Sequence, residues 1–170
     1  MSGIDYTPFA PTLPPARARA LPWATVMAGS LVTIVPVVAG IPLLPPFGLL
    51  MLIAWRLLAR FALRPWAAAP LGLFDDLVSG QPLGSSVLLW SLCFVVIELI
   101  EVRLVFRDFW QDWMIAAGAI AFGLCAGRLI AVPVAARVDQ AVIGQIAISI
   151  LLFPLATRIV AAIEAKRVQA

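Results

Sequence analysis

The sequence alternates between long apolar runs and short breaks that carry proline, glycine or charge. From position 20 to position 55 it contains no charged residue, which is a longer stretch than a buried helix of a soluble protein needs. Such runs are typical of transmembrane helices, which pair their backbone polar groups internally. The pattern predicts six spans, over residues 22–40, 47–63, 65–78, 84–101, 113–133 and 140–163. The third is shorter than the about 20 residues that a span normally needs, so it either borrows flanking residues or enters the membrane only partly.

Prolines are expected to shape two of these spans. Pro36 lies inside the first predicted span, and Pro154 lies inside the sixth. Proline removes one helix hydrogen bond and clashes with the preceding turn. We therefore expect Pro36 to kink the first span and Pro154 to break the sixth.

Residues 102–113 follow a different pattern. Apolar and aromatic residues recur there at the spacing of one helix face, and charged residues fill the other face. Amphipathic helices rich in aromatic residues commonly lie at the membrane surface. We expect a separate interfacial helix, which would act as a membrane anchor or as a cytosolic docking surface.

The composition supports an integral membrane protein. Of 170 residues, 63% are hydrophobic and 12% are charged, against about 25% charged residues in a soluble domain. No segment is long and polar enough to form a separate soluble domain. We expect an all-α membrane domain of about six transmembrane helices over residues 21–163, a flexible cytosolic tail over residues 1–20, and a short cytosolic tail over residues 164–170.

Lysine and arginine are unevenly distributed between the two sides of this arrangement. Cytoplasmic loops of membrane proteins carry an excess of these residues. In a six-span topology only Arg137 falls clearly in a loop on the outer side, and we expect both termini in the cytosol. The basic residues on the predicted cytosolic side are Arg17, Arg19, Arg60, Arg64, Arg103, Arg107, Lys166 and Arg167.

The sequence offers little of the chemistry that enzymes use. It has no histidine, the commonest metal ligand and general base, and Cys93 and Cys125 lie far apart in apolar runs. Asp75 and Asp76 would point about 100° apart on a helix with 3.6 residues per turn, so they cannot share a proton as a catalytic pair does. We expect no enzymatic activity, no metal or other cofactor, and no nucleic acid partner.

Several charged residues fall inside predicted spans, where they are costly unless paired or functional. Depth along the spans places Arg56 near Glu98 at the inner boundary and Asp76 near Arg128 in the outer half. We expect two intramembrane ion pairs, Arg56 with Glu98 and Asp76 with Arg128. Each would either hold helices together or form part of a site for a ligand or ion.

One short segment combines carboxylates with regularly spaced glycines. Gly72, Asp76, Gly80 and Gly84 are each four residues apart, a spacing that places residues on one face of a continuous helix. Gly72 and Gly80 would allow another helix to approach closely. Gly80 together with Pro82 also predicts a helix end, and a following serine is a plausible N-cap for the next helix.

This segment resembles the central motif of the rod shape-determining protein MreD family. The match comprises Gly72, Asp76, Gly80, Leu83 and Gly84, and Asp75 is an extra residue beside the family's aspartate position. The resemblance implies a non-enzymatic scaffold of the bacterial rod complex in the inner membrane, which helps to maintain cell shape by organising lateral peptidoglycan synthesis. It implies MreC as the main partner, with MreB, RodA and an elongation-specific penicillin-binding protein as direct or indirect partners, besides membrane lipids.

A second function from another class remains open. The MreD family is thought to resemble the substrate-binding subunits of energy-coupling-factor vitamin transporters, a six-helix fold, and this implies a small-molecule-binding membrane subunit as the alternative. Those subunits dock their partner through small residues in the first helix, where this chain has Ala24 and Ala28. The short apolar outer loops and the few polar residues in the outer half argue against a vitamin site.

Overall fold

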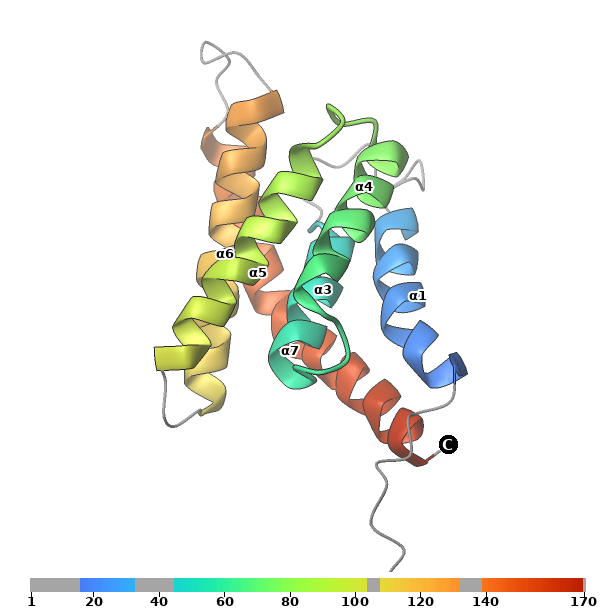
Figure 1. Ribbon diagram of the computed structural model, residues 1–170. Coiled ribbons are helices and arrows are strands. Elements are labelled where there is room, and N and C mark those ends of the chain that lie inside the picture. Colours follow the sequence, from blue (N-terminus) through green and yellow to red (C-terminus); the bar gives the residue numbers. More distant parts are fainter. Residues whose placement is uncertain (1–15, 33–44, 104–107, 132–138, 170) are drawn as a thin grey trace, which may run out of the picture.

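The computed structural model describes residues 16–32, 45–103, 108–131 and 139–169. This part of the chain folds into helices and contains no strand (Figure 1). The helices follow the order of the six predicted spans. They are α1 (Ala16–Val32), α3 (Phe47–Leu58), α4 (Ala68–Ser79), α5 (Ser85–Arg103), α6 (Phe109–Ala131) and α7 (Asp139–Gln169), with a 3-10 turn, η1 (Pro65–Ala67), before α4.

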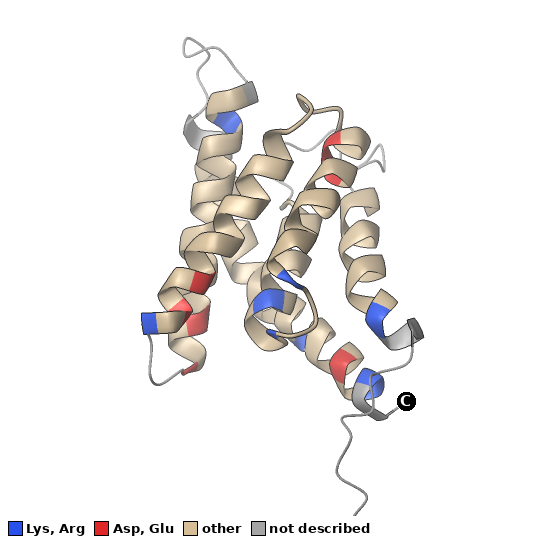
Figure 2. Ribbon diagram, viewed as in Figure 1, with Lys and Arg blue, Asp and Glu red and all other residues tan. Residues whose placement is uncertain are grey.

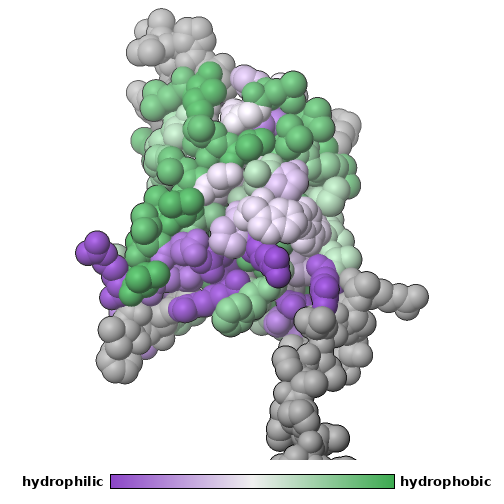
Figure 3. All heavy atoms as spheres, viewed as in Figure 1, coloured by the Kyte–Doolittle hydropathy of each residue, from purple (hydrophilic) through white to green (hydrophobic). Residues whose placement is uncertain are grey.

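Three of the helices are long and apolar enough to cross a membrane, namely Ser85–Arg103, Phe109–Ile130 and Val142–Arg167. Figure 3 shows apolar side chains over much of one face of the molecule and a hydrophilic band toward one end. Such an exposed apolar surface suits lipid rather than water. The described part of the protein is therefore all-helical and has the features of a membrane protein, as the hydropathy pattern predicts.

Helix α3 forms the centre of the bundle although it is short. Nine of its twelve residues are buried, because α1, α6 and α7 all pack against it. The indole of Trp55 is completely buried and donates a hydrogen bond of 2.8 Å to the Thr25 hydroxyl on α1. A helix of twelve residues reaches only about 18 Å at 1.5 Å per residue, which is less than the hydrocarbon core of a bilayer, about 30 Å.

Two glycines allow α1 and α3 to approach each other at their adjoining ends. A Cβ atom on Gly29 would lie 3.0 Å from the backbone carbonyl group of Phe47. A Cβ atom on Gly48 would collide with the Ser30 hydroxyl and would lie 3.3 Å from Oδ1 of Asp75. The absence of side chains at these positions therefore brings the start of α3 against both α1 and α4.

Several boundaries differ from the predicted ones. Helix α1 begins at Ala16 and α7 continues to Gln169, so residues 16–20 and 164–169, which were predicted to lie in the two tails, are helical. Helix α7 also runs through Pro154 without interruption, and the predicted break is wrong. The expected kink at Pro36 lies outside the described residues.

The predicted interfacial helix over residues 102–113 is not a separate element where the structure describes it. Val102 and Arg103 end α5, and Phe109 already begins α6. The aromatic residues at its C-terminal end instead cover the first turns of α6, where the rings of Trp110 and Trp113 pack edge to face at 5.6 Å. The indole of Trp113 donates a hydrogen bond of 3.3 Å to the carbonyl oxygen of Ile150, which links α6 to α7.

Charged residues gather at one end of the bundle. Figure 2 shows most of them around the beginning of α1, the end of α7 and the connection between α5 and α6. The opposite end carries the two aspartates of α4 and the arginine near the end of α6. The start of α1 and the end of α7 lie at the same, charge-rich end (Figure 1).

Candidate functional site

The segment from Gly72 to Gly84 forms a tight connection between α4 and α5. Helix α4 ends at Ser79, and its C-cap Gly80 adopts a left-handed conformation with φ 68°. Its backbone N–H donates to the carbonyl oxygen of Asp76 at 3.1 Å. Gly84 also has a positive φ, 96°, and α5 starts immediately after it. Glycine adopts such values without steric penalty, so the predicted helix end at Gly80 is confirmed.

The carboxylate of Asp76 caps the beginning of α5. It is only 1% exposed. One of its oxygens accepts the backbone N–H of Gly84 at 2.7 Å, and the other accepts the backbone N–H of Ser86 at 2.8 Å and the Ser85 hydroxyl at 3.0 Å. The first N–H groups of a helix have no partner within it, and the helix dipole favours a negative charge there. The side chain of Asp76, a residue of α4, thus caps the N-terminus of α5.

The four regularly spaced residues do not form one contact face. A Cβ atom on Gly72 would lie 2.7 Å from the carbonyl oxygen of Ser86 and 2.8 Å from the Cα atom of Val87, so α4 and α5 touch backbone to backbone there. Gly80 has no neighbour within 4 Å of such an atom, and Leu83 is exposed. Close helix approach is therefore correct for Gly72 and wrong for Gly80.

The predicted pairing of Asp76 with Arg128 is wrong. The carboxylate of Asp76 already has three donors from the start of α5, while Arg128 is exposed near the end of α6. The prediction rested on the depth of the two residues along their predicted spans, which could not indicate that Asp76 faces α5.

The predicted pairing of Arg56 with Glu98 is also wrong in its acidic partner. The guanidinium of Arg56 contacts Glu101 at 3.0 Å, both side chains being buried, and Arg60 reaches the other Glu101 oxygen at 3.6 Å. Glu98 is exposed on a neighbouring face of α5. Phe94 and Glu101 lie on the buried face of α5, but sequence spacing could not distinguish the two acids, because Glu98 and Glu101 are four and seven residues from Phe94 and both spacings fit one face.

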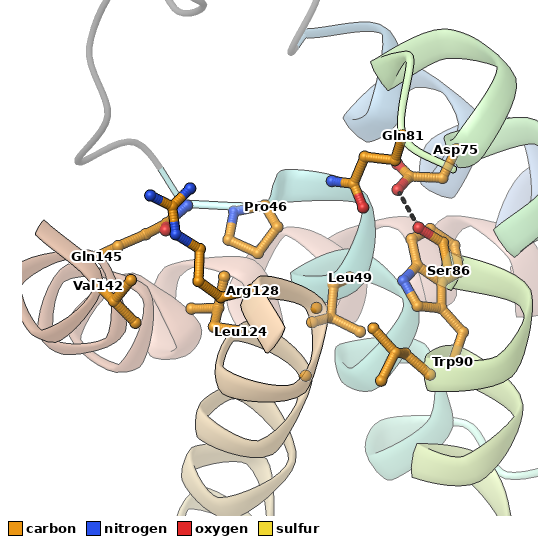
Figure 4. A pocket seen from close by; sticks show the side chains of 13 residues that line it. Pro46, Leu49, Asp75, Gln81, Ser86, Trp90, Leu124, Arg128, Val142 and Gln145 are labelled. Atoms are coloured by element: carbon orange, nitrogen blue, oxygen red, sulfur yellow. Dashed lines mark hydrogen bonds between the residues drawn. The ribbon is translucent and has the colours of Figure 1, made fainter. Parts of the chain in front are cut away.

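A cavity of about 340 Å³ lies beside the α4–α5 connection, between α3, α5, α6 and α7. Polar side chains surround it in Figure 4: Asp75, Gln81 and Ser86 on one side, and Arg128 and Gln145 on the other. Its apolar lining consists of Pro46, Leu49, Leu89, Trp90, Gly123, Leu124, Gly127 and Val142. This end of the bundle therefore has more convergent polar groups than the sequence indicated.

Asp75 and Asp76 have separate roles although they are neighbours in sequence. Asp75 is half-buried, and one of its oxygens accepts the Ser86 hydroxyl at 3.1 Å at the wall of the cavity. Asp76 instead binds the backbone of α5. Within the described residues no group of three or more histidine, cysteine, aspartate or glutamate side chains is placed to hold a metal ion. The site is therefore a capped helix start beside a cavity with a cationic and an anionic wall.

Small residues on α6 and α1 divide into inward and outward positions. On α6, a Cβ atom on Gly123 would meet Leu49 at 3.0 Å and one on Gly127 would meet Leu89 at 3.4 Å, whereas Gly118 faces open space. On α1, Ala24 and Ala28 are exposed. Outward small-residue surfaces therefore exist on α1 and at one point of α6.

Comparison of the chain with models of protein families, with curated proteins and with solved structures gave no match.

Proposed function

We propose that this protein is a non-enzymatic inner-membrane scaffold of the bacterial rod complex, which organises lateral peptidoglycan synthesis and so helps to maintain cell shape. The observation that carries the proposal is the segment from Gly72 to Gly84, whose residues resemble the MreD motif. Gly72, Asp76, Gly80 and Gly84 each have a geometric role in joining α4 to α5. A motif that builds a rigid connection, rather than a reaction centre, suits a scaffold.

The proposed topology has six spans with both termini in the cytosol. The uneven distribution of charge supports it, because the basic end of the bundle corresponds to the cytosolic side under the positive-inside rule. The α4–α5 connection and the cavity would then lie toward the outer surface of the cytoplasmic membrane. In this topology the short helices α3 and α4 would lie among the longer helices within the membrane.

The proposed main partner is MreC, a protein with a single membrane helix and a large outer domain in the resembling family. Helices associate in lipid through close packing, which small residues permit. The exposed Ala24 and Ala28 on α1 and the open Gly118 on α6 are the surfaces that suit such contact. MreB, RodA and the elongation penicillin-binding protein would be reached through the same assembly or through the basic end.

Depletion in rod-shaped cells tests the proposal directly. We expect cells to round up and to lose ordered wall insertion, with shape restored by the unaltered chain. A photo-crosslinking amino acid at Gly118 or Ala28 should capture MreC, whereas one at the exposed Leu151 on α7 serves as the matched control. Retained rod shape after depletion would contradict the proposal.

The alternative function is a small-molecule-binding membrane subunit of a vitamin-type transporter, with the corresponding six-helix fold. The cavity beside Asp75 and Arg128 favours it, because ligand sites combine apolar walls with a few convergent polar groups. Unchanged cell shape together with loss of high-affinity uptake of one small molecule would select this alternative.

A further inference from the structure

The cavity between α3, α5, α6 and α7 carries opposite charges on opposite walls. Figure 4 shows Arg128 of α6 on one side and Asp75 of α4 on the other, with Gln81 beside Asp75. Within the described residues no carboxylate pairs with Arg128 and no cation pairs with Asp75. An arginine at the depth of lipid headgroups attracts anionic groups, so an anionic partner from outside the chain would bind it.

The arginine side of the cavity suits a phosphate. A guanidinium presents several N–H donors in a fixed plane that matches the oxygens of phosphate or carboxylate. Arg128 lies one turn before the end of α6 at Ala131, which places its head at the depth of lipid headgroups in the proposed topology. Gln145 of α7 lines the same side and adds an amide.

The aspartate side of the cavity suits an ammonium group. The Asp75 oxygen that accepts the Ser86 hydroxyl at 3.1 Å retains further lone-pair capacity. The neighbouring Asp76 cannot serve, because the start of α5 occupies its carboxylate. The extra aspartate beside the family motif therefore faces the cavity, while the motif aspartate is structural.

The floor of the cavity is apolar. Leu49, Leu89 and Leu124 line it, and Trp90 lies beneath Ser86 (Figure 4). Its volume of about 340 Å³ is at the small end of the range for ligand sites, about 300–1,000 Å³. These dimensions accommodate a headgroup and the first carbons of a chain rather than a whole lipid.

From this geometry we infer that the cavity binds a phosphoethanolamine group, with its phosphate on Arg128 and its ammonium on Asp75. The group could belong to the headgroup of an aminophospholipid or to a free zwitterion. Its binding is separate from the scaffold role, since partner contact is proposed for outward positions on α1 and α6. Loss of the ligand would therefore leave MreC capture intact.

Titration of the full-length protein in detergent, followed by native mass spectrometry, tests the inference. The probes are dioleoyl phosphatidylethanolamine, dioleoyl phosphatidylglycerol, dioleoyl phosphatidylcholine and free phosphoethanolamine. We expect one saturable site with preference for phosphatidylethanolamine over the other two lipids. Equally tight binding of free phosphoethanolamine would identify a soluble ligand as the source, and much weaker binding would identify the lipid.

Two variants test which residue binds the phosphate of the ligand and which binds its ammonium group. Arg128→Gln and Asp75→Asn should each weaken phosphatidylethanolamine binding roughly tenfold or more, as expected for loss of a charge-assisted hydrogen bond. The matched controls are Arg158→Gln, an exposed arginine on α7, and Asp108→Asn, at the start of α6. Both controls should bind as the unaltered protein does, because they lie outside the cavity.

A variant that fills the cavity with a larger side chain tests the location while Arg128 and Asp75 are both retained. Leu124→Trp should abolish binding while circular dichroism and elution volume stay unchanged. Equal affinity for all three lipids, or loss of affinity in Arg128→Gln without any loss in Asp75→Asn, would overturn the zwitterion assignment. Binding that survives Leu124→Trp would overturn the location.

Discussion

The carboxylate of Asp76 accepts the backbone N–H of Gly84 at 2.7 Å across the connection between α4 and α5. Gly84 has a φ of 96°, a value that a side chain disfavours. The same carboxylate accepts the N–H of Ser86. One helix therefore caps the next, and the glycine conformation and the carboxylate depend on each other.

Replacing Asp76 should destabilise the protein in proportion to the lost acceptors. Asp76→Ala leaves two backbone N–H groups without their partner, and we expect a loss of about 2–4 kcal/mol. Asp76→Asn keeps one acceptor oxygen and should lose less. Unfolding of the purified variants by denaturing detergent, followed by tryptophan fluorescence, measures both values.

A double variant separates this cap from the ion pair that the sequence suggested. Because Arg128 does not contact Asp76, the effects of Asp76→Ala and Arg128→Ala should add within about 0.5 kcal/mol. If the double variant proved more stable than Asp76→Ala alone, the two side chains would be interacting after all.

Gly72 should not tolerate a methyl group. In Gly72→Ala the new Cβ would press on the backbone of Ser86 and Val87 at 2.7–2.8 Å, and backbone has little freedom to move. We expect a loss of about 1–3 kcal/mol. The matched control is Gly118→Ala on α6, which faces open space and should be neutral or stabilising by up to about 1 kcal/mol through helix propensity. Equal effects in both variants would contradict the close approach.

Gly80 should be sensitive for a different reason. It has free space around it but a φ of 68°, so Gly80→Ala should cost about 1–2 kcal/mol through backbone strain alone. Gly80→Asn should cost less, because asparagine tolerates the left-handed region. The same unfolding assay ranks the two variants. A larger loss in the asparagine variant would point to steric overlap instead.

At the other end of the bundle, Glu101 should be more important than Glu98. Glu101→Gln leaves Arg56 buried without a counter-charge, and we expect a loss of about 3–5 kcal/mol. Glu98→Gln removes an exposed carboxylate and should change stability by no more than about 0.5 kcal/mol. The reverse order would restore the pairing that the sequence predicted.

The order and type of the helices could be predicted because each apolar run marks one helix. The lengths of the helices could not be predicted in the same way. The second span was expected to continue to residue 63, but α3 ends at Leu58. The turn that follows brings Arg60 within 3.6 Å of Glu101, a contact between residues far apart in sequence that hydropathy does not record.

The position of the candidate site could be predicted from the sequence, but the contacts within it could not. Glycine spacing and Pro82 indicated the helix end at Gly80, and a serine was expected to cap α5. The carboxylate that caps it comes from the preceding helix, Asp76, nine positions before Ser85. Spacing four residues apart suggested a shared face for Gly72 and Gly80, but the chain leaves the helix at Gly80, and the periodicity ends with it.

The proposed topology predicts which ends of the bundle face outward. A chain with Cys93 and Cys125 replaced by alanine provides the background, and single cysteines are introduced at Gln81, beside the α4–α5 connection, and at Phe61, which is 98% exposed at the opposite end. If the basic end is cytosolic, a membrane-impermeant maleimide added to intact spheroplasts should label Gln81→Cys and not Phe61→Cys. After permeabilisation both should react, which controls for accessibility. Labelling of Phe61→Cys in intact spheroplasts would invert the topology and would place the cavity and its proposed ligand on the cytosolic side.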